Sequence, residues 1–61
     1  MRKYFVTFKL YDHERFRSDE IELEPREKAN YDTFFQKVDD SLNHWHNFYC
    51  EYILSWSLIE D

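Results

Sequence analysis

The chain has 61 residues, of which 43% are hydrophobic and 21% aromatic, and its formal net charge is −5. This length accommodates one small domain, and the acidic excess argues against binding of a nucleic-acid backbone as the main task, which calls for a basic patch. The single cysteine excludes an intrachain disulfide, so we expect a dense aromatic core or a second copy to add stability.

The first predicted element is a β-strand over residues 4–11, directly after the N-terminal Met-Arg-Lys. Its alternating core-facing residues are Tyr4, Val6, Phe8 and Leu10. The opposite face is only half polar, because it carries Phe5 and Tyr11, so this strand is expected at the centre of a sheet. No apolar run reaches the length of a signal peptide or a transmembrane helix, so we expect a soluble cytoplasmic protein without membrane contact.

A second strand is predicted over residues 17–24, after a polar loop without glycine or proline. In this strand Ile21 and Leu23 point to the core, while Glu20, Glu22 and Glu24 point away. Phe16 has the same parity as these glutamates, so either a bulge shifts the register near Ser18 or Phe16 packs on the outer face. Pro25 ends the strand, since proline cannot donate to the ladder.

An amphipathic helix is predicted over residues 31–47. Its apolar stripe consists of Tyr31, Phe34, Phe35, Val38, Leu42 and Trp45. Asn30 is the expected N-cap, accepting a hydrogen bond from the amide of Asp32 or Thr33, and Asn47 suits a left-handed C-cap. The opposite helix face is acidic, which membrane-lying helices are not, so we expect the stripe to pack on the sheet.

The last predicted element is a strand over residues 50–59. Uninterrupted alternation places Cys50, Tyr52, Leu54, Trp56 and Leu58 on the core face. The order ββαβ, with a right-handed crossover, returns this strand parallel to the second strand and beside the first. The prediction is therefore a single α+β domain over residues 1–61, with a mainly antiparallel three-stranded sheet and one helix on one face.

One helix covers only one face of such a sheet, so the other face would leave much apolar surface in water. We expect a homodimer through this uncovered face, with the exposed edge of the last strand as the alternative. The residues predicted for the interface are Phe5, Tyr11, Ile53, Ser55, Ser57 and Ile59.

Several side chains have functional groups that can bind metals or take part in catalysis. His44, His46 and Cys50 have zinc-ligand chemistry and Asp40 adds a carboxylate, but residues two apart on a helix diverge, so no metal site is expected. Serine, histidine and aspartate are present without any glycine or nucleophile elbow, so we expect neither catalytic residues nor a cofactor.

The predicted function is a non-enzymatic interaction protein that regulates or inhibits another macromolecule. In size, acidity and aromatic content the chain resembles small inhibitors from phages or mobile elements, and antitoxins. The residues predicted to bind an unidentified protein partner are Glu20, Glu22, Asp39, Asp40, Asn43 and His44. The alternatives are a nucleic-acid binder that uses Arg2, Lys3, Arg15 and Arg17 with exposed aromatic rings, and a zinc- or manganese-dependent enzyme.

Overall fold

The computed structural model describes the backbone of residues 1–61 and every side chain except those of Trp45 and His46. Its elements are β1 over Arg2–Leu10, β2 over Phe16–Leu23, α1 over Tyr31–His46 and β3 over Cys50–Glu60. The predicted ββαβ order is confirmed, and the predicted ends of the elements differ from the observed ones by at most two residues.

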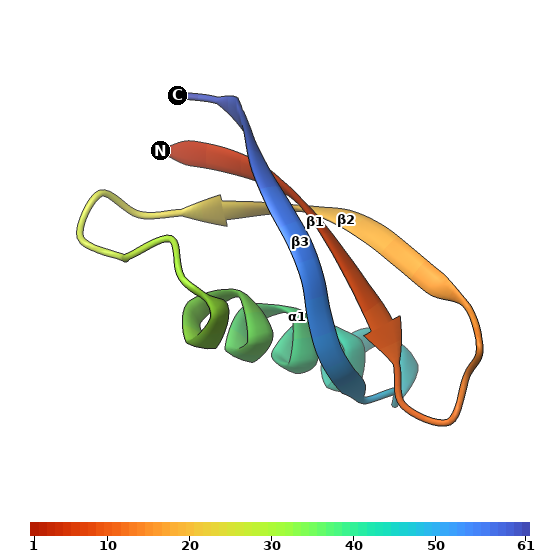
Figure 1. Cartoon of the computed structure of the whole chain (residues 1–61). Helices are drawn as coiled ribbons and strands as arrows, with labels where there is room; N and C mark the ends of the chain where they lie inside the picture. Colours follow the sequence, from red (N-terminus) through yellow and green to blue (C-terminus); the bar gives the residue numbers. More distant parts are fainter.

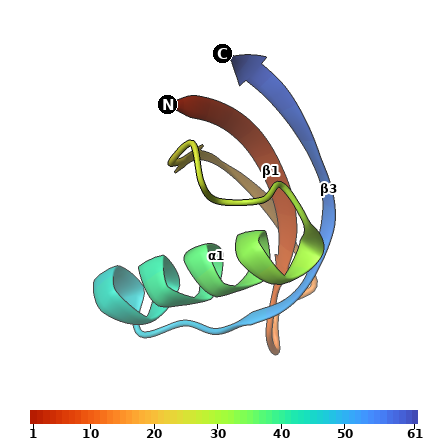
Figure 2. The ribbon, with the colours of Figure 1, turned by 90° about the vertical axis from the view of Figure 1, so that its left-hand side faces the viewer.

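The three strands form one sheet in the order β2-β1-β3, and both outer strands run antiparallel to β1. This α+β architecture was predicted. Helix α1 lies along one face of the sheet, which we call the helix face, and the other is the back face (Figure 1). In Figure 2 the sheet curves over α1, and the ends of β1 and β3 that carry the two termini rise beyond the helix.

The core lies between α1 and the helix face. Its buried residues are Tyr4, Val6, Phe8, Leu10, Ile21, Leu23, Phe34, Val38, Leu42, Cys50 and Ile53. Phe34 of α1 is fully buried, with its ring centroid 5.1 Å from that of Tyr4 and 5.0 Å from that of Trp56. Phe34, Val38 and Leu42 of the predicted stripe are therefore core residues, and Phe35 packs against them. Tyr31 is 42% exposed, and the side chain of Trp45 lies outside the described residues.

Both predicted caps of α1 are present. The side-chain oxygen of Asn30 accepts a hydrogen bond from the Thr33 N–H at 2.9 Å, which decides between the two predicted donors. Asn47 has φ 57° and ψ 33°, and its backbone N–H donates to the Leu42 carbonyl. Asparagine adopts this left-handed backbone conformation more readily than most other residues, so the helix can end here without a glycine.

The predicted alternation along β3 is wrong, because its pairing with β1 contains register shifts. Phe8 lies opposite Ile53, whereas the next pair is Thr7 with Ser55, so Leu54 has no opposite residue. Each such bulge reverses which residues face the core. Ile53, predicted for the back face and the dimer interface, is only 6% exposed in the core, whereas Leu54, predicted for the core, is 56% exposed.

A second bulge, between Lys9 and Leu10, moves Tyr52 from the predicted core face to the back face. There its ring centroid lies 6.5 Å from that of Phe16. Since the β1–β2 register is unbroken and Phe16 lies opposite Lys9, the outer-face alternative for Phe16 is the right one.

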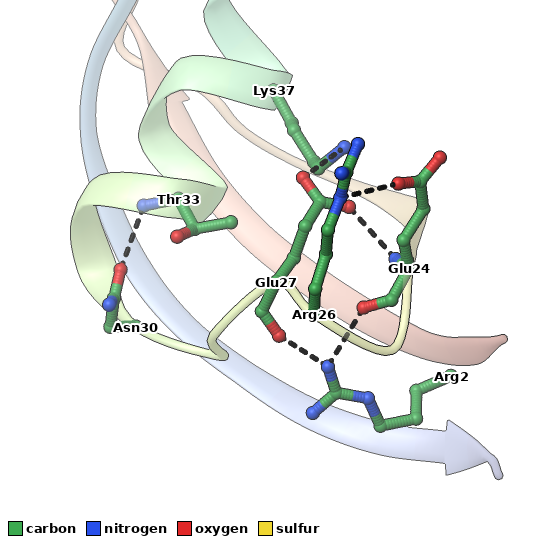
Figure 3. A network of polar contacts seen from close by, with 7 residues as sticks. All are labelled: Arg2, Glu24, Arg26, Glu27, Asn30, Thr33 and Lys37. Atoms are coloured by element: carbon green, nitrogen blue, oxygen red, sulfur yellow. Dashed lines mark hydrogen bonds and ion pairs between the residues drawn. The ribbon is translucent and has the colours of Figure 1, made fainter.

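The connector between β2 and α1 is fixed by a polar network (Figure 3). The Glu27 carboxylate accepts a hydrogen bond from the Glu24 N–H at 2.8 Å and pairs with Lys37 of α1 at 3.0 Å. Both contacts favour the charged carboxylate, first the backbone hydrogen bond and then Lys37, so the pKa of Glu27 is lowered. Arg2 donates to the carbonyl oxygens of Glu24 and Glu27, which ties β1 to the same connector.

Candidate functional site

The predicted partner-binding residues lie on two different sides of the molecule. Glu22 lies opposite Lys3 and Glu20 opposite Phe5, which places both glutamates on the back face. The remaining four, Asp39, Asp40, Asn43 and His44, belong to α1, which covers the helix face. The structure therefore does not bring the six residues together as one surface.

Asp39 and Asn43 of α1 have contacts that hold the fold together. Asp39 Oδ1 accepts a hydrogen bond from the Cys50 N–H at 2.9 Å, and Asn43 Nδ2 donates to the Asp39 carbonyl at 2.7 Å. These contacts fasten the start of β3 to the second half of α1. Asp40 and His44 are exposed, so they are the predicted residues of α1 that a partner can reach most readily.

Cys50 has the properties of a core residue. Its thiol is buried, and burial, with a smaller contribution from the Asp39 charge, raises its pKa to about 11. A protonated, buried thiol is a poor nucleophile and a poor metal ligand. Among the side chains that the structure describes, no group of three or more His, Cys, Asp or Glu residues could hold a metal ion, and His46 lies outside them.

The back face carries polar side chains between its aromatic ones. Thr7 Oγ1 and Ser18 Oγ lie 2.9 Å apart across the β1–β2 pair. Phe5 is half exposed, but its neighbours in register are Glu20 and Ser57. Ile53 lies in the core, while Tyr52 and Phe16 lie on the back face, so the apolar surface of this face differs from the predicted one.

Five of the six residues predicted for that interface are exposed, namely Phe5, Tyr11, Ser55, Ser57 and Ile59. Their role in a dimer stays a prediction. Tyr11 lies past the end of β1, where its N–H donates to the Tyr49 carbonyl at 2.8 Å, and Ile59 lies near the opposite end of the sheet. The exposed apolar members of the set are therefore spread out.

Exposed apolar side chains gather instead on one segment of β3, residues 54–59, which we call the open edge. They are Leu54 at 56%, Trp56 at 37%, Leu58 at 49% and Ile59 at 50% exposed. The sequence placed the first three in the core, but α1 covers the first part of β3 more completely than the rest. The ring centroid of Trp56 still lies 5.0 Å from that of Phe34 in α1. The last part of the strand rises past the helix (Figure 2).

The backbone of the β3 edge changes at the same place. The Cys50 N–H donates to Asp39, and the Ile53 N–H donates to the Tyr31 hydroxyl at 3.1 Å, so side chains of α1 close the first part of the edge. Among the described residues, no side-chain acceptor receives a hydrogen bond from the backbone of the open edge. The difference between the closed and the open part of the β3 edge depends on which part of β3 lies within reach of the α1 side chains. No sequence pattern indicated this.

A separate open pocket of about 370 Å³ lies beside the β1–β2 loop. It is lined by Leu10, His13, Arg15, Phe16, Arg17 and Phe48. It contains two of the four cations predicted for nucleic-acid binding. The other two have internal contacts, Arg2 with backbone carbonyls and Lys3 with Glu60 and Glu20 at 3.5 and 3.7 Å.

In the part of the chain that the structure describes, no helix is both long and apolar enough to cross a membrane. Comparison with known protein families, with curated proteins and with solved structures found no match to this chain. What the protein does is therefore inferred from its own surfaces.

Proposed function

We propose that the protein is a non-enzymatic interaction module that acts as a homodimer in the cytoplasm and regulates or inhibits another macromolecule. The observation that carries this proposal is the exposure of four neighbouring apolar side chains, Leu54, Trp56, Leu58 and Ile59. Contiguous exposed apolar surface in a small protein marks a contact with another protein. A domain with a core of this size also gains stability from association.

The surface proposed for the other macromolecule is the outer side of α1. Asp32 and Asp40 are exposed there and form no ion pair with the described residues. Lys37, the cation of α1, is already paired with Glu27 at 3.0 Å. This leaves the outer side of α1 with an excess of negative charge, which favours a basic partner surface and speeds its association.

The test compares three tagged baits in extract of the source cell: the wild type, Asp32→Asn/Asp40→Asn, and the charge-matched control Asp12→Asn/Glu14→Gln in the β1–β2 loop. Support requires a protein that the wild type and the control retain and the α1 variant loses. Calorimetry with that purified protein must then show weaker binding to the α1 variant. A partner that binds all three baits with equal affinity would contradict the proposed surface.

The pocket beside the β1–β2 loop favours a second candidate, a binder of single-stranded nucleic acid. Arg15 and Arg17 lie there with Phe16 and Phe48, and cations with aromatic rings bind phosphates and stack on bases. The net charge of −5 opposes such binding. A gel shift at micromolar protein that weakens steeply with salt and disappears in Arg15→Gln/Arg17→Gln would favour this candidate, and no shift at low salt would exclude it.

A further inference from the structure

We infer that the open edge, residues 54–59 of β3, pairs antiparallel with the open edge of a second copy, which joins two three-stranded sheets across a two-fold axis. This inference rests on the homodimer of the proposed function and specifies its contact surface.

The hydrogen-bonding capacity of β3 supports strand pairing at this segment. β3 has a neighbour, β1, on one side only, and the free side of an edge strand is a template for another strand. Asp39 and Tyr31 occupy this side at Cys50 and Ile53, so a second strand cannot pair there. Beyond Ile53 the described residues provide no such side-chain acceptor. The Trp56 ring still packs on Phe34 of α1 at 5.0 Å, and the last part of β3 rises past the helix (Figure 2).

The side chains of the open edge supply the apolar contact. Trp56 and Leu58 lie opposite Val6 and Tyr4, which places them on the helix face, where α1 leaves them partly exposed. In a two-fold pair the helix faces of both copies lie on the same side of the joined sheet, so these side chains meet their counterparts. Their burial provides the main driving force for association.

The charge distribution permits two copies to approach at this segment. A chain of net charge −5 repels its own copy unless the contact region is locally neutral. No residue from 52 to 59 carries a charge at neutral pH. The acids that directly flank this segment are paired with cations of β1, Glu51 with Lys9 at 2.9 Å and Glu60 with Lys3 at 3.5 Å, and Asp61 lies beyond Glu60 at the end of the chain.

The other edge of the sheet fits a second copy less well. β2 has exposed charged side chains on both faces, Arg17 and Asp19 on the helix face and Glu20 and Glu22 on the back face, of the kind that blocks strand addition. Pairing of β3 with β2 of another copy would also leave a free edge at each end and continue as a filament. Pairing of two β3 strands closes after two copies, so the two-fold dimer is the consistent assembly.

The experiment uses the full chain. Mass is measured by light scattering during gel filtration from low to high micromolar protein, and amide hydrogen exchange is followed at the same concentrations. The test variant is Leu54→Lys/Leu58→Lys, and the matched control is Phe5→Lys on the back face. Circular dichroism and thermal melting verify that each variant is folded.

We expect a wild-type dimer, a Phe5→Lys dimer, and a folded Leu54→Lys/Leu58→Lys chain whose dissociation constant is about 100-fold higher or more, because like charges then face each other. Exchange at residues 54–59 should slow as the wild-type concentration rises. A wild-type monomer at every concentration overturns both this inference and the proposed homodimer. A dimer whose open edge exchanges without protection overturns this inference alone, and loss of the dimer in Phe5→Lys places the interface on the back face.

Discussion

Asp39 of α1 accepts a hydrogen bond from the backbone N–H of Cys50, the first residue of β3, at 2.9 Å. A hydrogen bond to a charged acceptor contributes about 1.5–3 kcal/mol when it is shielded from water. This contact is half-buried, and it closes the β3 edge where α1 begins to cover it. It therefore links the packing of the helix to the part of β3 that remains available for pairing.

Removal of this carboxylate should destabilise the fold. We expect Asp39→Ala to lower the free energy of unfolding by about 1–3 kcal/mol, because the Cys50 N–H loses its acceptor. Asp40→Ala removes the neighbouring exposed carboxylate and should change that free energy by about 0.5 kcal/mol or less. Urea unfolding of both variants measures the difference, and equal effects would contradict the structural role of Asp39.

The Cys50 thiol should react slowly with a thiol reagent. Its pKa of about 11, against an ordinary value of 9.0, makes the thiolate about 100-fold scarcer at pH 8, and burial blocks access further. We expect the native chain to react at least about 100-fold more slowly than the same chain unfolded in urea at the same pH. Similar rates in the two states would show that Cys50 is accessible.

Acid should weaken the connector network through Glu27. Because its pKa in the folded state is lowered, this carboxylate stabilises the fold above its ordinary pKa of 4.5, and the stabilisation is lost as the pH falls through the lowered value. Glu27→Gln should therefore be less stable than the wild type at pH 7, and the gap should narrow below about pH 4.5. The control is Glu14→Gln in the β1–β2 loop. Urea unfolding over a pH series checks this, and a gap that does not vary with pH would exclude the linkage.

Local signals in the sequence predicted the helix well, whereas the position of β3 depends on contacts that no local pattern records. The caps at Asn30 and Asn47 follow from the chemistry of single residues and their immediate neighbours. The bulge at Leu54 depends on how β3 pairs with β1, residues far away in the sequence. Together with the bulge between Lys9 and Leu10, it places Ile53 in the core instead of the predicted interface.

The candidate surfaces were predicted less well for a related reason. Alternation assumes that a core-facing residue is covered, but coverage depends on how far α1 extends along the sheet. Trp56 and Leu58 are on the predicted face and remain 37% and 49% exposed, although the Trp56 ring packs on Phe34 of α1 at 5.0 Å. The helix covers this end of the sheet incompletely, since the last part of β3 rises past it (Figure 2). Asp39 was predicted to contact a partner, and its contact with Cys50 became visible only in three dimensions.

The Tyr31 hydroxyl marks where the closed part of the β3 edge ends, because it accepts a hydrogen bond from the Ile53 N–H at 3.1 Å. Tyr31→Phe keeps the ring, whose centroid lies 6.1 Å from that of Phe35, and removes only this acceptor. We expect the free energy of unfolding to fall by about 0.5–1.5 kcal/mol.

The Ile53 amide should also exchange faster in Tyr31→Phe than in the wild type. The exchange rates of amides in the middle of β1 serve as the control, because they should rise only as much as the loss of global stability requires. The measurement is amide hydrogen exchange at low protein concentration. If the exchange rate of the Ile53 amide is the same in the variant and the wild type, the hydroxyl does not close this edge. Because Tyr31 contacts the edge at Ile53 and not at residues 54–59, the same variant should leave dimerisation through that segment intact.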